Sequence, residues 1–235
     1  CEYSPYAYND EIRRGFITLE GGFRVGLAGT AVECKDGIST IKYINSLNIR
    51  ISRELWGCAD KVMKYVYGNT LIISPPGCGK TTILRDIIRQ ISNQGINIPV
   101  VDERCEISGI YLGNIQFDLG ICTDVLCCYS KSIGMNMMLR SMAPKIIAVD
   151  EIGGSEDVHA IEYAMHCGCR MIATAHADSM EELQKKPVFE RLIREKRFER
   201  YVLLGNEPQI GTIQEIYDER GSLLYQDQEE KTAIC

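Results

Sequence analysis

The sequence lacks any apolar run of transmembrane length, and no signal peptide is visible in it. We therefore expect none of these 235 residues to form a membrane-spanning helix. An excess of basic residues is also missing, because 26 Lys and Arg stand against 32 Asp and Glu, for a net charge of −6. Contact with nucleic-acid phosphates needs a basic face, so this balance argues against direct nucleic-acid binding as the main role. The basic residues of 191–200 alternate with glutamates and predict a solvated helix face.

The sequence also lacks the cysteine spacing that is typical of a metal or disulfide framework. Its 11 cysteines include no CxxC pair; Cys127 and Cys128 are adjacent, and Cys167 and Cys169 are too close for an ordinary zinc knuckle. We predict mostly buried, reduced thiols in a cytosolic protein. The first residue is Cys1 rather than Met, and we expect the chain to be a fragment without its N-terminal part.

The patterning that is present belongs to a globular α/β protein. Hydrophobic residues make up 45% of the chain and charged residues 25%, which is ordinary for a protein that buries a core. Residues 1–53 combine short alternating segments with Gly-rich turns and predict a small β-rich N-terminal subdomain. Residues 54–225 alternate apolar strands with amphipathic helices, the pattern of a mostly parallel sheet with helices on both faces. Residues 226–235 are polar and are expected to form a flexible tail.

Local periodicity predicts the individual elements. In the N-terminal part we expect a hairpin and two further strands, at 15–19 with 23–27, 38–44 and 47–51. In the larger part we expect strands and a closing hairpin at 70–73, 98–101, 145–149, 170–174, 201–204 and 212–217 with 223–225. Helices are predicted over 55–66 and after the turn at 74–82, and two more are predicted with Ser155 and Ser179 as their N-terminal caps.

The segment 71–82 reads Leu-Ile-Ile-Ser-Pro-Pro-Gly-Cys-Gly-Lys-Thr-Thr and indicates a nucleotide phosphate site. In the pattern G-x-x-x-x-G-K-[ST], backbone N–H groups wrap the β-phosphate, the lysine reaches the β- and γ-phosphates, and the hydroxyl binds Mg²⁺. Lys80 is therefore the predicted phosphate-binding lysine and Thr81 a predicted Mg²⁺ ligand. Ser74 departs from the pattern, because Gly is usual at its position. The predicted ATP-binding residues are Pro75, Pro76, Gly77, Cys78, Gly79, Lys80, Thr81 and Thr82.

An acidic pair follows a second apolar strand. Asp150 and Glu151 come directly after Lys-Ile-Ile-Ala-Val. Because ligands of open parallel sheets bind at the carboxyl ends of the strands, we expect this pair to share one edge with the phosphate-binding turn. Asp150 is then a metal-site residue for Mg²⁺, and Glu151 is the general base for the attacking water. A helix-capping acidic pair is the structural alternative.

Further candidates end other strands. Asp102 and Glu103 precede Arg104; the acids could orient water or Mg²⁺, and the arginine could contact the γ-phosphate or form an ion pair. His176 stands where a γ-phosphate sensor would lie, although a lone histidine is often structural. Phosphoryl transfer is accelerated by an arginine finger, often from a neighbouring subunit. The candidates for this finger are Arg140, Arg104, Arg50 and Arg53.

Several segments together resemble the stage III sporulation protein AA family, with the weakest likeness at the C-terminal end. The segments are Gly15–Thr18, Gly22–Gly26, Asn48–Ile51, Val101–Ile107, Thr123–Val125, Met138–Pro144, Ile146–Gly153 and Ala173–Ala177. That family is similar to the ATPases of type II and type IV secretion and pilus systems, which carry an acidic box and a histidine box. Asp102 with Glu103, and His176, match these boxes by position. Asp150 is a departure, because those ATPases usually carry Gly before the glutamate.

The resemblance implies an AAA/RecA-like P-loop ATPase that uses ATP and Mg²⁺ and forms a homo-oligomer, with a hexameric ring expected. It also implies a cytoplasmic location at the membrane on the mother-cell side of a sporulating bacterium. There the ATPase would energise membrane-embedded sporulation channel proteins. Two other functions remain open. One is a nucleic-acid translocase or loader, which the acidic balance disfavours; the other is a regulatory module that binds ATP with little hydrolysis, which Asp150 and Glu151 disfavour.

Overall fold

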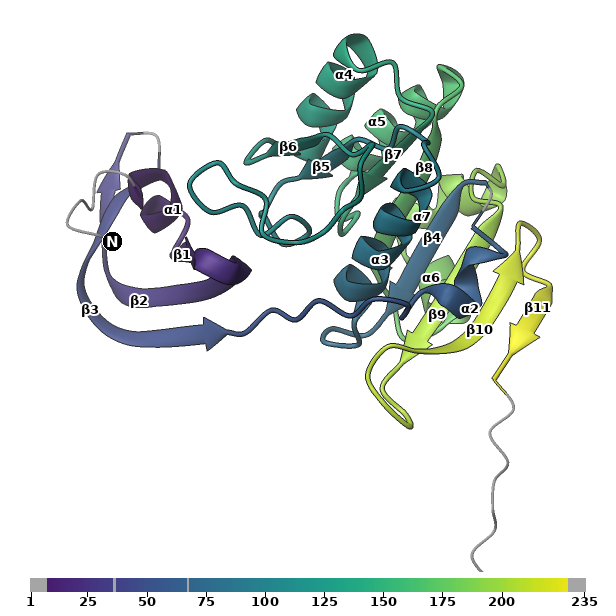
Figure 1. The fold of residues 1–235 in the computed structure, drawn as a ribbon, viewed down its shortest axis with the longest axis horizontal. Coiled ribbons are helices and arrows are strands. Elements are labelled where there is room, and N and C mark those ends of the chain that lie inside the picture. The colour runs from purple at the N-terminus through teal and green to yellow at the C-terminus, as the bar shows by residue number, and fades with distance from the viewer. Residues whose placement is uncertain (1–7, 36, 67, 228–235) are drawn as a thin grey trace, which may run out of the picture. The chain divides into compact units, whose positions relative to one another are not determined.

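The computed structural model describes residues 8–35, 37–66 and 68–227 (Figure 1). Contacts divide the chain into two compact units. One comprises the described residues up to Glu54 together with Ser108–Asp118, and the other comprises Leu55–Ile107 and the described residues from Leu119 onward. No local pattern in the sequence indicated that 108–118 belongs with the N-terminal unit. Among the helices of the described residues, none has the length and apolar character needed to cross a membrane.

The N-terminal unit contains a three-stranded antiparallel sheet in the order β1-β2-β3. The predicted hairpin is present, and Gly21 and Gly22 reverse the chain with φ of 80° and 73°. The two strands predicted at 38–44 and 47–51 are one strand, because the irregularity between them is a bulge and not a turn. The register with β2 shifts there, and Tyr43 has φ of 49°. The elements are α1 (Asn9–Arg13), β1 (Phe16–Leu19), a 3₁₀ turn (Glu20–Gly22), β2 (Phe23–Cys34) and β3 (Gly37–Arg50).

The larger unit is built on an eight-stranded sheet in the order β11-β10-β9-β4-β8-β7-β5-β6. The six strands from β9 to β6 run parallel, and β10 and β11 extend the sheet as an antiparallel hairpin. The predicted α/β class with a mostly parallel sheet is therefore confirmed. The strands are β4 (Thr70–Ser74), β5 (Val100–Asp102), β6 (Val125–Cys127), β7 (Ile146–Val149), β8 (Arg170–His176), β9 (Arg200–Gly205), β10 (Thr212–Asp218) and β11 (Leu223–Gln226).

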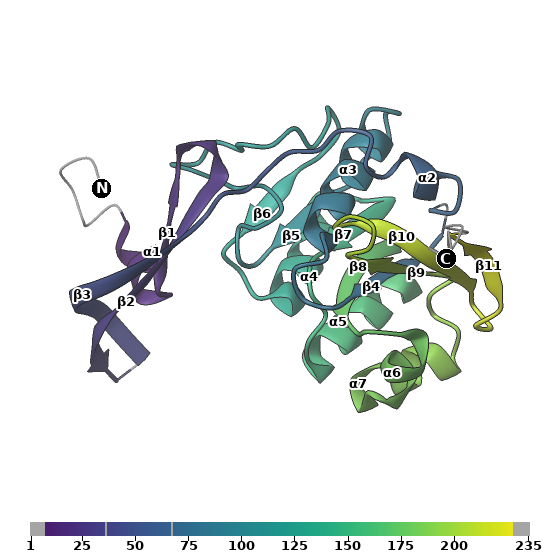
Figure 2. The same ribbon diagram turned by 90° about the horizontal axis from the view of Figure 1, so that it is seen from below.

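Helices cover both faces of this sheet, with α3 on one side and α4 to α7 on the other (Figure 2). Alternate residues of β4 divide the core, because successive strand side chains point to opposite faces. Leu71 and Ile73 pack with α4 to α7, whereas Ile72 packs with α2 and α3. The helices are α2 (Asp60–Met63), α3 (Lys80–Ser92), α4 (Lys131–Ser141), α5 (Ser155–His166), α6 (Met180–Lys185) and α7 (Pro187–Arg194).

Some local predictions in this unit are wrong. The helix expected over 55–66 is α-helical only at Asp60–Met63, because turns flank it and Gly57 has φ of 80°. Ser155 does not cap α5; the carboxylate of Asp157 does, accepting N–H groups of Gly153 at 3.1 Å and Gly154 at 3.4 Å. The expected tail also begins too early. Gln226 is the last residue of β11, and 228–235 lie outside the described residues.

Candidate nucleotide-binding site

The Gly-rich turn lies between the carboxyl end of β4 and the start of α3. Pro75 and Pro76 lack the N–H group that a sheet ladder needs, so the chain leaves the sheet directly after β4. Gly77 and Gly79 then adopt φ of 79° and 81°, a conformation that residues with a Cβ rarely take. Lys80 opens α3, so the free N–H groups of the first helical turn point toward the same space. The turn has the backbone geometry that binds phosphate.

Ser74 occupies an ordinary strand position, which explains why Gly is not needed there. It is the last residue of β4, is fully buried, and pairs in register with His176 of β8. Its hydroxyl donates to the carbonyl oxygen of Pro75 at 2.7 Å. Further along the turn, Cys78 is buried and Thr82 is half-buried in the first turn of α3.

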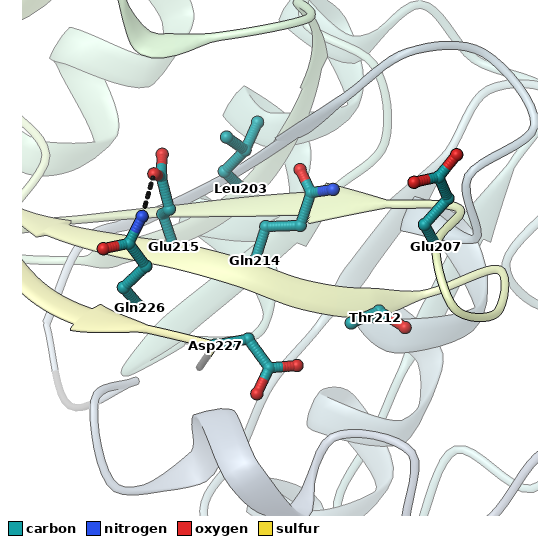
Figure 3. A pocket seen from close by; sticks show the side chains of 7 residues that line it. All are labelled: Leu203, Glu207, Thr212, Gln214, Glu215, Gln226 and Asp227. Atoms are coloured by element: carbon teal, nitrogen blue, oxygen red, sulfur yellow. Dashed lines mark hydrogen bonds between the residues drawn. The ribbon is translucent and has the colours of Figure 1, made fainter. Parts of the chain in front are cut away.

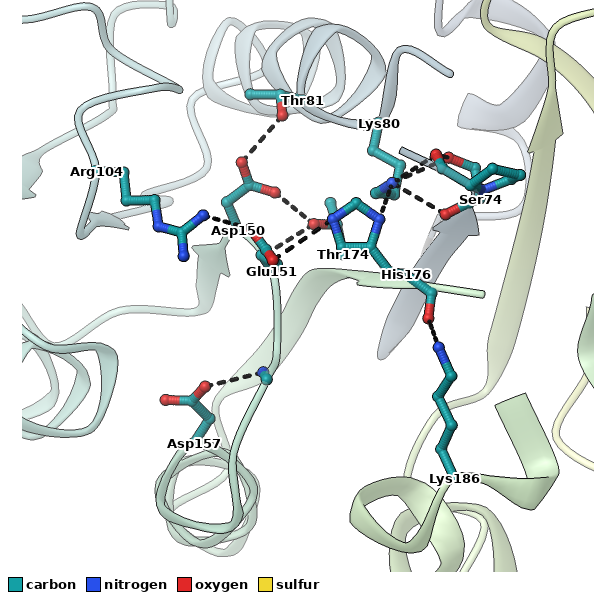
Figure 4. Close-up of polar contacts among 12 residues, drawn as sticks. Ser74, Lys80, Thr81, Arg104, Asp150, Glu151, Asp157, Thr174, His176 and Lys186 are labelled. Carbon is teal, nitrogen blue, oxygen red and sulfur yellow. Dashed lines mark hydrogen bonds and ion pairs between the residues drawn. The ribbon is translucent and has the colours of Figure 1, made fainter. Parts of the chain in front are cut away.

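Lys80 is buried, and its ammonium group lies against the end of β4, where the turn begins (Figure 4). The Nζ atom donates to the backbone oxygens of Ser74 and Pro75, each at 3.0 Å, and to the Ser74 hydroxyl at 3.1 Å. It also lies 2.9 Å from Nδ1 of His176. Burial lowers the pKa of Lys80, and the nearby charge of Asp150 opposes this shift. Since these hydrogen-bond partners carry no negative charge, the ammonium can still bind an anionic group such as phosphate.

Two oxygen donors suited to Mg²⁺ lie next to the turn. The hydroxyl of Thr81 donates to Oδ2 of Asp150 at 3.0 Å, which joins the start of α3 to the end of β7. Oδ1 of Asp150 accepts a hydrogen bond from the hydroxyl of Thr174 on β8. A hydroxyl beside a carboxylate matches the preference of Mg²⁺ for oxygen ligands. The predicted metal residues, Thr81 and Asp150, are thus adjacent to each other.

Glu151 lies between two cationic or potentially cationic side chains. Its Oε2 accepts from Nη1 of Arg104 at 3.0 Å, and its Oε1 lies 3.5 Å from Nε2 of His176. Its backbone has φ of 46°, and its N–H donates to the hydroxyl of Thr174 at 2.8 Å. The His176 ring therefore connects Lys80 to Glu151. In the neutral tautomer that accepts from the Lys80 ammonium at Nδ1, the N–H group is at Nε2, on the side of Glu151.

The three charged residues at and just after the end of β5 take different positions. Asp102 is buried, and its carboxylate accepts the N–H groups of Glu106 at 2.9 Å and Ile107 at 3.1 Å, so it stabilises the following turn. This burial does not match a surface salt bridge. Glu103 forms an ion pair of 2.6 Å with Lys131 of α4. Arg104 forms the ion pair with Glu151, so the acid partner that the sequence left open is Glu151.

The other arginine candidates belong to other elements. Arg140 is an exposed residue of α4 and borders a surface groove of about 320 Å³. Arg50 ends β3, and Arg53 follows it, both in the N-terminal unit. Among the candidate fingers, Arg104 contacts a predicted catalytic residue, Glu151.

Sequence reasoning missed three side chains of this region. Thr174 joins Asp150 to the backbone of Glu151, Lys131 binds Glu103, and Lys186 donates to the backbone oxygen of His176. None of them stands in a recognisable motif. Thr174 could have been found from strand alternation, because it lies two residues before His176 and therefore on the same face of β8.

A second hollow, of about 310 Å³, lies on the antiparallel side of the sheet (Figure 3). Its lining includes three carboxylates, Glu207, Glu215 and Asp227, and Gln226 donates to Glu215 at 3.2 Å. Among the described residues that line it there is no lysine, arginine or histidine. Its charge is unfavourable for phosphate, which leaves the turn at 74–82 as the candidate nucleotide site.

The fold and the site together define a P-loop protein of RecA-like fold. The Gly-rich turn, an acidic pair and a histidine meet at the carboxyl edge of one parallel sheet. The chain belongs to the family described as "Sporulation stage III, protein AA", whose model matches residues 1–224. This confirms the family suggested by the sequence motifs.

Individual relatives agree with this assignment. The chain is 41% identical to Stage III sporulation protein AA of Bacillus subtilis (strain 168) over 232 residues, 94% of this chain and 75% of that protein. The pilus retraction motor PilT, solved with bound ADP, has a TM-score of 0.57 at 15% identity, over 85% of this chain and 62% of that one. The Legionella pneumophila ATPase DotB has a TM-score of 0.54 at 17% identity, over 77% of this chain and 53% of that one. At such identities the solved structures share the fold, and this chain spans little more than half of their lengths.

Proposed function

We propose that this protein is an Mg²⁺-dependent ATPase, a motor of the secretion-ATPase type that energises a membrane channel complex during sporulation. The observation that carries the proposal is the contact path from Lys80 through His176 to Glu151. This path joins the proposed phosphate-binding lysine to Glu151, the proposed base for the attacking water. A module that only bound nucleotide would not need the contact between His176 and Glu151.

In the proposed reaction each residue has one task. Lys80 and the backbone N–H groups of the turn hold the β- and γ-phosphates of ATP. Thr81 and Asp150 would hold Mg²⁺, which supplies positive charge to the β- and γ-phosphate oxygens. Glu151 accepts the proton of the attacking water. Glu151 follows β7, which is separated from β4 and its turn by a single strand, β8. This position suits attack of water on the γ-phosphate.

His176 is proposed as the sensor of the γ-phosphate. Lys80 donates to Nδ1 of His176 at 2.9 Å, and a phosphate oxygen bound by Lys80 would compete for the same ammonium protons. Release of Nδ1 would free the ring to move, and its Nε2–H faces Glu151. The presence of the γ-phosphate would thereby change the surroundings of the base. Glu103 is proposed to support this region through Lys131.

The assembly is proposed to be a homo-oligomeric ring, with a hexamer expected and nucleotide at the subunit interfaces. Two observations support shared sites: the Arg140 side chain is exposed, and the Arg104 side chain is 60% exposed although it contacts Glu151. Either can reach a neighbouring subunit as an arginine finger. Membership of the sporulation family supports a location at the mother-cell side of the membrane, with membrane-embedded channel proteins as partners and no direct nucleic-acid binding.

Two substitutions separate binding from turnover. Lys80→Ala should abolish ATP binding, measured with a fluorescent nucleotide, whereas Glu151→Gln should retain binding and lose ATP turnover at least ~100-fold, the lower end of general-base effects. Glu190→Gln is the matched control, because Glu190 is an exposed glutamate paired only with Arg194 of the same helix. Unchanged turnover in Glu151→Gln would refute the base assignment. A several-fold rise of wild-type turnover with single-stranded DNA would favour the translocase alternative.

A further inference from the structure

Three thiols that are distant in the sequence meet beside β5 and β6. Cys105 lies in the turn after β5, Cys127 ends β6, and Cys128 follows it. Their sulfur atoms all lie within 4.8 Å of one another, and Sγ of Cys105 is 3.3 Å from Sγ of Cys128. The described cysteines are also less buried than the sequence suggested. Those that are buried are Cys78, Cys105 and Cys169.

The backbone holds these thiols together from two sides. Strand pairing places Cys127 opposite Asp102, and the N–H groups of Cys105 and Cys128 both donate to the carbonyl oxygen of Asp102, at 3.3 and 3.2 Å. Cys105 and Cys128 also adopt φ of 54° and 65°. Residues other than Gly take this conformation only where the surrounding structure imposes it. The backbone that carries the three thiols is therefore held in position by the fold.

We propose that Cys105, Cys127 and Cys128 form a binding site for a thiophilic metal cation of the Zn²⁺ or Cu⁺ class. A Zn–S bond of about 2.3 Å in tetrahedral geometry places the sulfurs roughly 3.8 Å apart. The sulfur separations, from 3.3 Å to at most 4.8 Å, include that value. Thiolate ligands select such soft cations over Mg²⁺, so the site does not compete with the proposed magnesium residues.

The site has an open side. The three cysteines form a complete group among the described residues, with no His, Asp or Glu donor joining them. Cys128 is exposed and Cys127 is half-buried, so water can complete a fourth position. Metal can enter and leave from that side. An exchangeable site is therefore expected, and not a permanently closed structural one.

The thiol cluster is also linked to the proposed active site along the backbone. Cys105 directly follows Arg104, whose guanidinium contacts Glu151. Metal bound to Cys105 would fix the turn that presents Glu103 and Arg104 and would thereby alter ATP turnover. This last step rests on the proposed function, whereas metal binding itself does not.

Metal binding can be measured without any ATPase assay. Reduced, chelator-treated protein is titrated with Cd²⁺, followed by thiolate-to-metal charge-transfer absorption, and with Zn²⁺ in competition with a chromophoric chelator. We expect one tight equivalent per chain. The variant C105S/C127S/C128S should lose that equivalent or bind at least ~100-fold more weakly, since loss of an outer-shell partner alone costs ~10–100-fold. C167S/C169S is the matched control and should bind as the wild type does.

The same titration contains the results that would overturn the proposal. The proposal would be overturned if C105S/C127S/C128S bound as many tight metal equivalents per chain as the wild type. It would also be overturned if the thiols of the wild-type protein bound no Cd²⁺. Formation of a Cys105–Cys128 disulfide, with no Cd²⁺ bound by the reduced protein, would assign the cluster to redox chemistry instead. The single variant C127S is titrated as well, because it perturbs the fold less than the triple variant does. Far-ultraviolet circular dichroism checks that each variant is folded. Lys80→Ala should retain the metal, so failure of the ATPase proposal and failure of this one are distinguishable.

Discussion

Replacement of Thr174 by valine tests how the acidic pair is held in place. Thr174 is fully buried, donates to Asp150 and accepts the N–H group of Glu151 at 2.8 Å. Valine has nearly the same shape, so Thr174→Val removes two hydrogen bonds and leaves the packing intact. The perturbation is therefore confined to the polar links between β8 and the acidic pair.

The expected magnitude follows from those two links. A hydrogen bond to a charged group contributes ~1.5–3 kcal/mol, and an unpaired buried donor costs a further ~1–3 kcal/mol. The free energy of unfolding should therefore fall by about 3 kcal/mol. Glu151 would lose its backbone anchor at a residue with φ of 46°, so its carboxylate should shift. A displacement of ~1 Å at a reacting group can reduce the rate ~100-fold, and we expect a fall of that order in kcat.

The assay compares Thr174→Val with Thr174→Ser. Serine keeps the hydroxyl and loses only the methyl group, so Thr174→Ser should retain turnover within a few-fold and stability within about 1 kcal/mol. Urea denaturation gives the free energy of unfolding, and steady-state phosphate release gives kcat and KM. Nucleotide affinity should change little in either variant, because Lys80 and the turn are untouched.

Two outcomes would refute the role assigned to Thr174. If Thr174→Val turns over ATP at the wild-type rate, Glu151 does not depend on this hydroxyl or is not the base. If Thr174→Ser, which keeps the hydroxyl, loses as much activity as Thr174→Val, the hydroxyl is not what preserves activity, and the role assigned to its two hydrogen bonds is wrong.

Two further predictions concern stability. Asp86→Asn should lower the free energy of unfolding by about 3 kcal/mol in urea denaturation, because it breaks a buried ion pair of 2.6 Å with Arg89. Burial alone would raise the pKa of Asp86, but hydrogen bonds from Ala59, Arg89 and Gln90 outweigh it and lower that pKa. The difference in free energy of unfolding between Asp86→Asn and the wild type should therefore shrink as the pH falls below 3.8. A difference that stays constant with pH would contradict this. Burial also raises the pKa of Cys169 from 9.0 to about 11, so its contribution to stability is present below pH 9 and is lost as the pH rises toward 11. Cys169→Ala should flatten that alkaline decline in a series of urea titrations, and an unchanged slope would show that other groups cause it.

The sequence predicted the parts of the site whose chemistry is local. A Gly-Lys-Thr turn after an apolar strand carries its own geometry, and the strand-end rule for parallel sheets brought Asp150, Glu151 and His176 to the same edge. Strand alternation can place Thr174 on the same face of β8 as His176, but its contacts with Asp150 and Glu151 depend on β8 lying beside β7 in one particular register. The same holds for Lys131, since α4 is a helix of mixed polar and Met residues without a clear apolar face.

Long-range features were missed for a different reason. The segment 108–118 joins the N-terminal unit through tertiary contacts that leave no periodic signal. The thiol cluster needs β6, which has only three residues, Val125–Cys127, and therefore too little alternation to detect. The position of Asp102 at the end of a strand suggested a residue that orients water or Mg²⁺. Its carboxylate accepts two N–H groups of the turn that follows, a contact that no sequence pattern indicated.

Particle mass measured together with ATP turnover tests the central claim most directly. Analytical ultracentrifugation with and without ATP gives the mass, and phosphate release over a range of protein concentrations gives turnover per chain. The proposed ring with shared sites predicts that turnover per chain rises as the chains assemble and that Glu151→Gln assembles without turnover. A monomer that hydrolyses ATP at its full rate at every concentration would contradict the account.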